Sequence, residues 1–278
     1  MAKVKESNNI KITKKFIKSL DKKTYFPHAL PVFQTKLDEL TQSIIEKTGT
    51  TEELAKKEAY VLIMNCLSEI MRQAQPLVEA AIDKRISEGK IKDAAQTKKS
   101  AAGNVFQQMV AYAIAQNIIH GNITANVAVT MSVKNILDEY ATIKVGDDDC
   151  QKPDSDVIVY NPDDDTTPVL NYSCKTSCRE RAGQTYKWKL LSDLATCSCP
   201  HIKGNGNCLV NKYNLEYSPK RSIYICFVTA DFYNEIAQPQ IAAMFNFFDK
   251  SYLAKSTSGV KSIQTFDKVI DDINEYFS

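Results

Sequence analysis

An acidic and a basic residue stand on two strand-like stretches at a spacing that suits phosphate chemistry. The stretches are 156–160 and 169–175, and a proline-bounded loop rich in aspartate joins them. Side chains alternate between the two faces of a strand, so Ser173 and Lys175 share one face. A hairpin that is symmetric about its loop places Asp156 opposite Ser173, one step along that face from Lys175. A carboxylate beside an ammonium can hold a divalent cation and orient water against a phosphodiester.

Oxygen ligands near this hairpin favour Mg²⁺, which prefers hard donors and keeps several waters. Asp156 is the first choice because the apolar strand starts directly after it, and Asp154 has the same parity and is the alternative ligand. The main-chain carbonyl of Cys174 is a further candidate. Lys175 is expected to polarise the attacking water or to neutralise the pentavalent phosphate. A purely structural cross-strand ion pair at a sheet edge is the competing interpretation.

The order Asp, strand, then Ser-Cys-Lys-Thr-Ser-Cys-Arg-Glu-Arg over 173–181 resembles type II restriction endonucleases of the PD-(D/E)XK superfamily. The closest likeness is to the branch that cuts CCGG- or CCNGG-like sites, to which BsaWI and EcoRII belong, and it covers residues 100–195. This resemblance implies an α/β fold whose mixed central sheet is flanked by helices. It also implies Mg²⁺ as cofactor, double-stranded DNA as partner and a homodimer whose symmetry mirrors the DNA site.

Two positions depart from the superfamily formula. Ser173 stands at the (D/E) position, as it does in that branch, where a glutamate from the following helix substitutes. No glutamate follows Lys175 at that spacing, and Asp193 is the nearest acid on the helix. The stretch 99–108 looks like the Ser-Gly-x-x-Phe-Glu helix start of the same branch, with Gln107 in place of the glutamate. The resemblance therefore places Ser173 and Gln107 in the catalytic site; for Gln107, an exposed helix position is the alternative.

A charged triplet follows the second strand and is the candidate for reading bases. Arginine binds guanine O6 and N7 in a bidentate manner, and a carboxylate accepts from cytosine N4. Related enzymes use Arg-Asp-Arg-like triplets for a CC/GG step, so the resemblance implies recognition of C·G pairs; a charge cluster that caps the next helix is the alternative. The candidate DNA-binding residues are Arg179, Glu180 and Arg181, with Gln184 and the loop residue Lys203 beside them.

Four potential metal ligands lie within twelve residues: Cys197, Cys199, His201 and Cys208. Three thiols and an imidazole can form a tetrahedral structural zinc site. Their spacing is not one of the common Cys-x₂-Cys patterns, so a Gly/Asn-rich loop with free cysteines is an equal alternative.

Composition limits the surroundings in which this chemistry takes place. The 278 residues carry a net charge of +2, so any DNA binding must use a local basic patch. No run reaches the ~18 apolar residues of a membrane span, and the N-terminus lacks the apolar core of a signal peptide. We therefore expect a cytoplasmic protein with no membrane partner and no small-molecule substrate. In that compartment the eight cysteines are thiols or metal ligands rather than disulfides.

The remaining patterns predict how the chain is organised. Residues 1–100 read as a helical N-terminal subregion, and residues 101–278 as the nuclease core with its recognition elements. Thr50-Thr-Glu-Glu53 is a capping-box pattern, and Pro76 is expected to start a further helix. The near-continuous apolar run 221–229 is typical of a central strand covered on both faces.

Three functions are compatible with these residues. The first is a Mg²⁺-dependent, site-specific endonuclease acting on double-stranded DNA. The second is a structure-specific repair or junction nuclease, which the Arg-Glu-Arg triplet argues against because such an enzyme does not read bases. The third is a non-catalytic zinc-containing DNA-binding protein, which the missing acids at Ser173 and Gln107 keep open.

Overall fold

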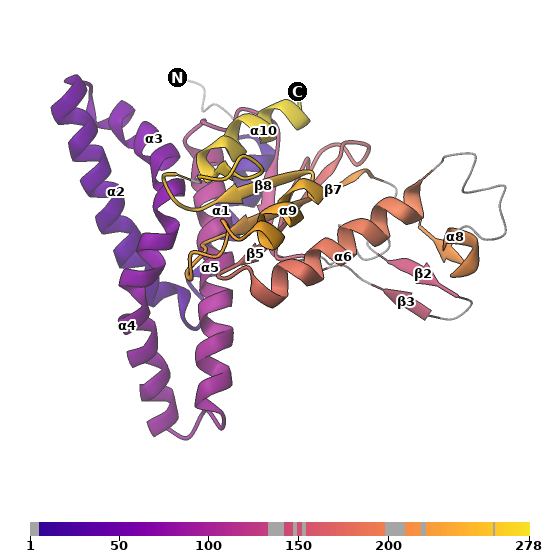
Figure 1. Cartoon of the computed structure of the whole chain (residues 1–278). Helices are drawn as coiled ribbons and strands as arrows, with labels where there is room; N and C mark the ends of the chain where they lie inside the picture. The colour runs from indigo at the N-terminus through magenta and orange to yellow at the C-terminus, as the bar shows by residue number, and fades with distance from the viewer. Residues whose placement is uncertain are drawn as a thin grey trace.

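The computed structural model has a helical N-terminal part followed by alternating strands and helices, as the sequence predicts (Figure 1). It describes residues 6–132, 142–146, 149–151, 154–197, 209–217, 221–257 and 259–278. The helices are α1 (Asn8–Leu20), α2 (Phe26–Thr48), α3 (Glu52–Leu62), α4 (Leu67–Ser87), α5 (Ala94–Ile119), α6 (Arg179–Thr196), α8 (Leu209–Lys212), α9 (Pro239–Met244) and α10 (Val269–Tyr276), with the 3₁₀ turns η1 (Ile63–Cys66), η2 (Phe245–Phe247) and η3 (Phe266–Lys268).

Local signals explain where α3 starts, but they misplace the next helix boundary. Thr51 is the N-cap of α3, and its side chain accepts from the amide of Leu54. The expectation that Pro76 starts a helix is wrong, because Pro76 lies inside α4 and the chain changes to 3₁₀ geometry at Ile63–Cys66 instead. Proline removes only one backbone hydrogen bond and bends the helix, and the buried stripe of α4 keeps it packed on both sides of that point.

The strands form two sheets, and the larger one is mixed. In this sheet the strands 128–130, 157–160 and 169–175 pair antiparallel to one another. From the strand 169–175 onward, neighbouring strands run parallel. A smaller antiparallel sheet, β3 (Asp149–Gln151), β2 (Ile143–Val145) and β6 (Leu215–Glu216), lies beyond the C-terminal end of α6 (Figure 1). The larger sheet has the order β1 (Ala128–Thr130), β4 (Val157–Tyr160), β5 (Val169–Lys175), β7 (Ile223–Thr229), β8 (Lys250–Leu253) and β9 (Gln264–Thr265).

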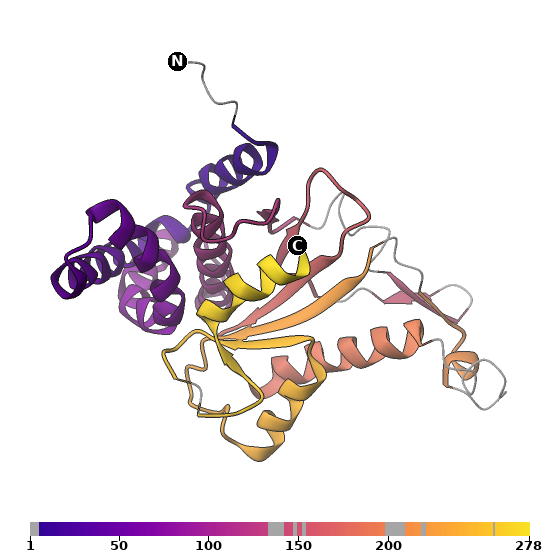
Figure 2. The same cartoon turned by 90° about the horizontal axis from the view of Figure 1, so that it is seen from above.

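Strand β7 is the central strand that the apolar run predicts. It lies between β5 and β8, parallel to both. Cys226 and Val228 belong to the hydrophobic cluster that contains α5 and α10, whereas Ile225 and Phe227 belong to the cluster beneath α6 and α9. Figure 2 shows the yellow α10 on one side of the strands and the salmon α6 on the other. Both faces of the sheet are therefore covered, which explains why polar residues are rare in this stretch.

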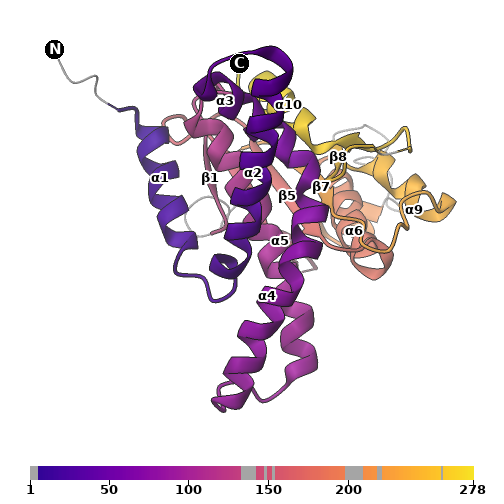
Figure 3. The ribbon, with the colours of Figure 1, turned by 90° about the vertical axis from the view of Figure 1, so that its left-hand side faces the viewer.

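The N-terminal helices pack directly against the sheet. One hydrophobic cluster extends from Leu20 to Ile273 and includes buried residues of α2 to α5. Helix α5 continues through residue 100, where the sequence suggests a boundary between subregions. The C-terminal end of α4 and the N-terminal end of α5 project together beyond the other elements as a helical hairpin (Figure 3). Within the described ranges, no helix is both long and apolar enough to cross a membrane.

Candidate active site

The hairpin of β4 and β5 has the register that a symmetric loop predicts. Val157 pairs with Tyr172, and Tyr160 pairs with Val169. Continuing that register by one residue places Asp156 opposite Ser173. Because Tyr172 belongs to the cluster on the α5 side, the alternation of side chains turns Ser173 and its neighbours of like parity to the α6 side.

Asp156 and Lys175 are in direct contact on this face. The Lys175 ammonium donates to Asp156 Oδ2 at 2.9 Å, and the backbone amide of Cys174 donates to the same oxygen at 2.8 Å. The side chains are only 7% and 13% exposed for Lys175 and Asp156 respectively. The carboxylate is therefore fixed by two donors, and its Oδ1 carries no hydrogen bond from the described part of the chain.

The second aspartate lies at the open side of the same site. Asp154 Oδ2 is 3.9 Å from the Lys175 ammonium, and this side chain is 43% exposed. Its backbone carbonyl accepts from Asn171 Nδ2 at 3.2 Å. Asn171 is buried on β5, and its Oδ1 has no hydrogen-bond partner within the described residues. Asn171 on the polar face of β5 thus holds the segment that precedes β4. The carboxylates of Asp154 and Asp156 both lie near the Lys175 ammonium.

The Cys174 carbonyl points toward the same side as these carboxylates. In a strand, the N–H and the C=O of one residue point the same way, and those of the next residue point the opposite way. The Cys174 amide points to Asp156, whereas the Lys175 carbonyl on the other side accepts from Ala230 at 3.1 Å. The geometry therefore directs the Cys174 carbonyl oxygen toward Asp156, where the sequence suggests a main-chain ligand.

Ser173 forms a buried connection to helix α6. Its hydroxyl is 0% exposed and lies 2.9 Å from Thr185 Oγ1. Thr185 was not among the residues that the sequence singles out, since a threonine on a helix carries no signal about its partner. This contact fixes α6 against the strand that carries Lys175.

A second buried network holds the first turn of α6. Glu235, which is 2% exposed, accepts from the amide of Cys178, the N-cap of α6, at 3.3 Å. The Glu235 amide donates to Asp231 at 2.7 Å, and Lys255 donates to the Asp231 carboxylate at 3.1 Å. A carboxylate near a helix N-terminus is stabilised by the exposed N–H groups and the helix dipole. No local pattern predicts this network, because its members lie far from α6 in the chain.

Burial also affects the thiol at this position. The pKa of Cys178 rises to about 12, mainly because burial disfavours the thiolate. The raised pKa favours a neutral thiol, and the Cys178 thiol is hydrogen-bonded with the Thr229 hydroxyl at 3.4 Å.

The candidate recognition residues are described to different degrees. Arg179, Glu180 and Arg181 form the first turn of α6, directly after the loop that leaves β5. Their side chains lie outside the described residues, as does all of Lys203. Gln184 is exposed on α6. The helix that carries the triplet therefore begins four residues after Lys175, with only residues 176–178 between them.

Gln107 is the residue that the resemblance places in the catalytic site where related enzymes have a glutamate. Gln107 is half-buried on α5, whose cluster takes the side chains of Tyr172 and Cys174 on the opposite face of β5. Among described residues, no hydrogen bond joins Gln107 to Asp156 or Lys175. Its neighbour Gln108 is the buried amide of this turn, and its Oε1 has no partner in the same described ranges.

Asp193 has a structural partner instead of a place in the site. Lys189 on the same helix binds the Asp193 carboxylate, and also Asp249 at 3.2 Å. Burial lowers the pKa of Lys189, but Asp193 and Asp249 together raise it above its ordinary value. Asp249 directly precedes β8 and also accepts from the amide of Ile225 on β7 at 2.7 Å, so this network joins α6 to both strands.

The zinc hypothesis falls mostly outside the described residues. Cys199, His201 and Cys208 are not described, and Cys197 is a half-buried free thiol at the end of α6. Within the described ranges, no three or more His, Cys, Asp or Glu side chains are grouped to hold a metal ion.

The donors near Lys175 do fit Mg²⁺. Mg²⁺ sites in nucleic-acid enzymes are built from one or two carboxylates, waters and substrate phosphates rather than from a full protein cage. Asp156 offers its unbonded Oδ1, Asp154 offers an exposed carboxylate, and the Cys174 carbonyl is directed to the same place. All are hard oxygen donors, and no soft ligand intervenes.

Comparisons with known proteins identify the family of this chain. The model of the family described as BsaWI restriction endonuclease type 2 matches residues 131–275, more than half of the chain. A solved complex of restriction endonuclease PspGI with substrate DNA is similar with a TM-score of 0.41 and 13% identity, over 87% of this chain and 92% of that chain. No curated protein sequence matches the chain.

Proposed function

The chain belongs to the BsaWI type 2 restriction endonuclease family and is therefore a hydrolase of that class; on this premise we propose that it cuts double-stranded DNA at a specific site in the presence of Mg²⁺. The observation that carries this proposal is the contact between Lys175 and Asp156 at 2.9 Å. A family assignment does not identify the residues that act, whereas this pair supplies an acid and an amine at one point of the sheet.

Asp156 is proposed as the main metal ligand, with Asp154 and the Cys174 carbonyl beside it. When bound, Mg²⁺ would neutralise charge on the scissile phosphate and supply a water of lowered pKa. Asp156 is held in place by the Cys174 amide and by Lys175, so its free oxygen keeps one direction. Preorganised groups of this kind need no rearrangement as charge develops.

Lys175 is proposed to orient the attacking water and to stabilise negative charge on the phosphate. Its side chain is almost fully buried, so the ammonium acts where bulk water screens it little. It already neutralises Asp156, and a phosphate arriving at this point would share the same cation. These roles of Asp156 and Lys175 do not require a charged residue at position 173, where the Ser173 hydroxyl is hydrogen-bonded with Thr185.

The arginines at the start of α6 are proposed to read C·G pairs. Arg179 and Arg181 can bind guanine in a bidentate manner, and Glu180 can accept from cytosine N4. The support is positional: the triplet opens α6, and Glu235 and Ser173 fix that helix against the catalytic strand. Gln184 follows on the same helix as a further candidate contact.

A homodimer is proposed to make the two cuts. One Asp156–Lys175 pair serves one strand, so cleavage of both strands of a duplex requires a second copy. A two-fold symmetric pair of chains would match a palindromic or nearly palindromic site.

Digestion of plasmid DNA by the purified chain in Mg²⁺ tests the proposal. Discrete fragments, lost on chelation with EDTA and restored by excess Mg²⁺, are the expected result. Cleavage of branched DNA alone would indicate a structure-specific nuclease. No cleavage of any plasmid by a folded chain would contradict the proposed activity.

A further inference from the structure

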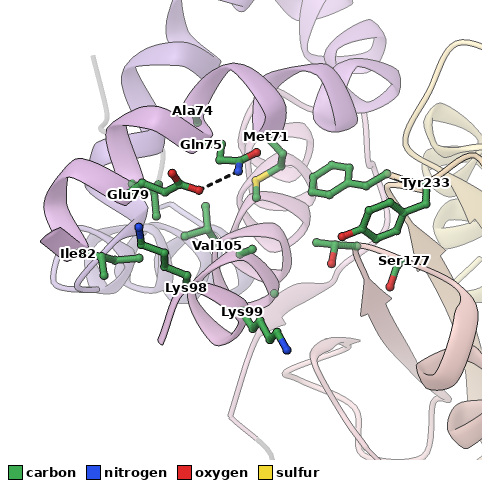
Figure 4. Close-up of a pocket in the computed structure, with 15 residues that line it drawn as sticks. Met71, Ala74, Gln75, Glu79, Ile82, Lys98, Lys99, Val105, Ser177 and Tyr233 are labelled. Atoms are coloured by element: carbon green, nitrogen blue, oxygen red, sulfur yellow. Dashed lines mark hydrogen bonds between the residues drawn. The ribbon is translucent and has the colours of Figure 1, made fainter. Parts of the chain in front are cut away.

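A pocket of about 430 Å³ opens between helices α4 and α5 and the loops that follow β5 and β7 (Figure 4). Met71, Val78 and Val105 are among the apolar residues at its helical end. In Figure 4, Tyr233 lies near Ser177 at the opposite end, toward the strands. We call four polar residues that line this pocket the polar rim: Lys99 on α5, and Thr176, Ser177 and Tyr233 on the two loops.

The polar rim adjoins the proposed catalytic centre. Thr176 and Ser177 are the two residues that directly follow Lys175. Two extended residues span at most about 7 Å, and a DNA strand advances by about 3.4 Å of helix axis for each phosphate. When one phosphate lies at Lys175, its neighbours on the same strand are thus within reach of Thr176 and Ser177, and Lys99 and Tyr233 line the same pocket as these two residues.

The side chains of the polar rim are available as donors. None of them makes a side-chain hydrogen bond or an ion pair within the described part of the chain, although an ammonium and three hydroxyls are present. The adjacent Lys98, by contrast, pairs with Asp83 at 3.2 Å. Lys99 is exposed, so a negatively charged ligand can approach it without breaking an existing pair.

The loop that carries Tyr233 is held rigidly. Asp231 and Asn234 on either side of the tip have φ angles of 47° and 54°, a left-handed conformation that persists only where the surroundings hold it. Lys255 binds the Asp231 carbonyl at 2.7 Å, and the amide of Phe232 donates to the Thr176 carbonyl at 3.0 Å. Yet the Tyr233 side chain is 72% exposed. A fixed backbone that presents an exposed aromatic hydroxyl is typical of a binding surface.

From these observations we propose that the polar rim binds the DNA backbone beside the scissile phosphate. Lys99 and the Tyr233 hydroxyl donate to phosphate oxygens, and Thr176 and Ser177 supply further hydroxyl donors. This inference rests on the proposed endonuclease function and extends it from the reacting phosphate to its neighbours. Such contacts set the position of the duplex without reading its sequence.

Equilibrium binding of two labelled duplexes tests the proposal, one containing the cleavage site and one unrelated in sequence. Ca²⁺ replaces Mg²⁺ so that the DNA stays intact, and affinity is followed by fluorescence anisotropy at increasing salt. For Lys99→Ala, the slope of log affinity against log salt should fall by about 0.9, the value for one phosphate. Tyr233→Phe removes one hydrogen bond to a charged group and should weaken both duplexes by about tenfold.

Lys90→Ala is the matched control, since Lys90 lies near the tip of the α4–α5 hairpin and pairs with Glu88 at 2.8 Å. Its salt slope should equal that of the unaltered chain. An equal fall of the salt slope in Lys90→Ala overturns this inference. Unchanged salt slope and affinity in Lys99→Ala and Tyr233→Phe overturn it as well. In both cases the proposed endonuclease function is retained. An unaltered chain that neither binds nor cuts duplex DNA overturns both.

Discussion

The Lys175 ammonium donates to the Asp156 carboxylate at 2.9 Å, between the end of β5 and the residue that precedes β4. Both side chains are largely buried, at 7% and 13% exposure. Removing one partner of such a pair leaves the other charge uncompensated in a poorly solvated place. Each substitution here therefore affects charge as well as shape, and its effect must be compared with that of a substitution elsewhere.

Replacing Lys175 by alanine should abolish cleavage and spare DNA binding. The ammonium is proposed to act on the reacting phosphate, whereas the groups proposed to hold the duplex lie elsewhere. Plasmid cleavage in Mg²⁺ and a gel-shift assay measure the two properties. Lys144→Ala is the control, because Lys144 forms an exposed pair with Glu216 at 3.3 Å in the smaller sheet. Retained cleavage would remove Lys175 from the mechanism.

Replacing each aspartate by asparagine separates the two candidate metal ligands. Asp156→Asn should eliminate cleavage at every Mg²⁺ concentration, because it removes the charge of the buried, fixed ligand. Asp154→Asn should keep cleavage but raise the Mg²⁺ concentration needed for half-maximal rate, since this carboxylate is 43% exposed and more distant from Lys175. The reverse order would assign the principal ligand to Asp154.

Arg181→Ala should lose about 1–3 kcal/mol of discrimination at one base pair. The reason is that the proposed bidentate contact to guanine would be lost, while the proposed contacts to the DNA backbone would remain. Cleavage rates on duplexes altered one pair at a time provide the measurement. Lys187→Ala, at an exposed position of the same helix, should leave the preference unaltered. An unchanged sequence preference in Arg181→Ala would exclude that residue from base reading.

Ser173→Ala should destabilise the fold by about 1 kcal/mol, the usual net value of a hydrogen bond. The substitution removes the buried contact with Thr185 that ties α6 to β5. Urea unfolding followed by circular dichroism measures the free energy. Ser87→Ala, whose hydroxyl is in an exposed bond to the Lys84 carbonyl, should change stability by less than about 0.5 kcal/mol. Equal effects of the two substitutions would contradict a special role for the Ser173 contact.

Stability should decline in mild acid because of His120. This ring stacks on Tyr60 with centroids 4.3 Å apart, and burial, helped by Lys56 and Lys57, lowers its pKa below the ordinary 6.5. The unfolded chain thus binds the proton more tightly. The stabilisation is complete at pH values above the pKa that His120 has in the unfolded chain. It is lost as pH falls from that pKa toward the lower pKa that His120 has in the folded chain.

The test is the free energy of unfolding in urea measured between about pH 7 and pH 5. His120→Gln should make this free energy depend less on pH than it does in the unaltered chain. His28→Gln is the control, because His28 is exposed on α2, and it should keep the original dependence. A His120→Gln chain with the full pH dependence would show that another group is responsible.

The hairpin could be predicted because its determinants are local. Alternating side chains assign faces, and a loop of given length assigns the register, so Asp156 lies opposite Ser173 as expected. The apolar run 221–229 likewise identified the central strand β7. In both cases the sequence pattern and the burial it implies belong to one short stretch of chain.

Contacts between distant segments could not be predicted in this way. Glu235 supports the first turn of α6 from a loop beyond β7, and nothing in its own neighbourhood indicates that partner. Pro76 gave a misleading local signal, because tertiary packing of α4 outweighs the loss of one backbone hydrogen bond. The contact between Asp156 and Lys175 could therefore be predicted from the sequence, whereas the contact of Glu235 with the start of α6 could not.

Only three residues, 176–178, separate Lys175 from Arg179 at the start of α6, so the Cα atoms of these two residues can be no more than about 14 Å apart. In the proposed roles, the residues that recognise a base pair, Arg179 to Arg181, are connected to the catalytic Lys175 by a very short segment of chain. Engineering a new target through Arg179 to Arg181 would then leave the stagger of the cut unchanged. Variants with a different overhang would have to come from a new arrangement of the two subunits.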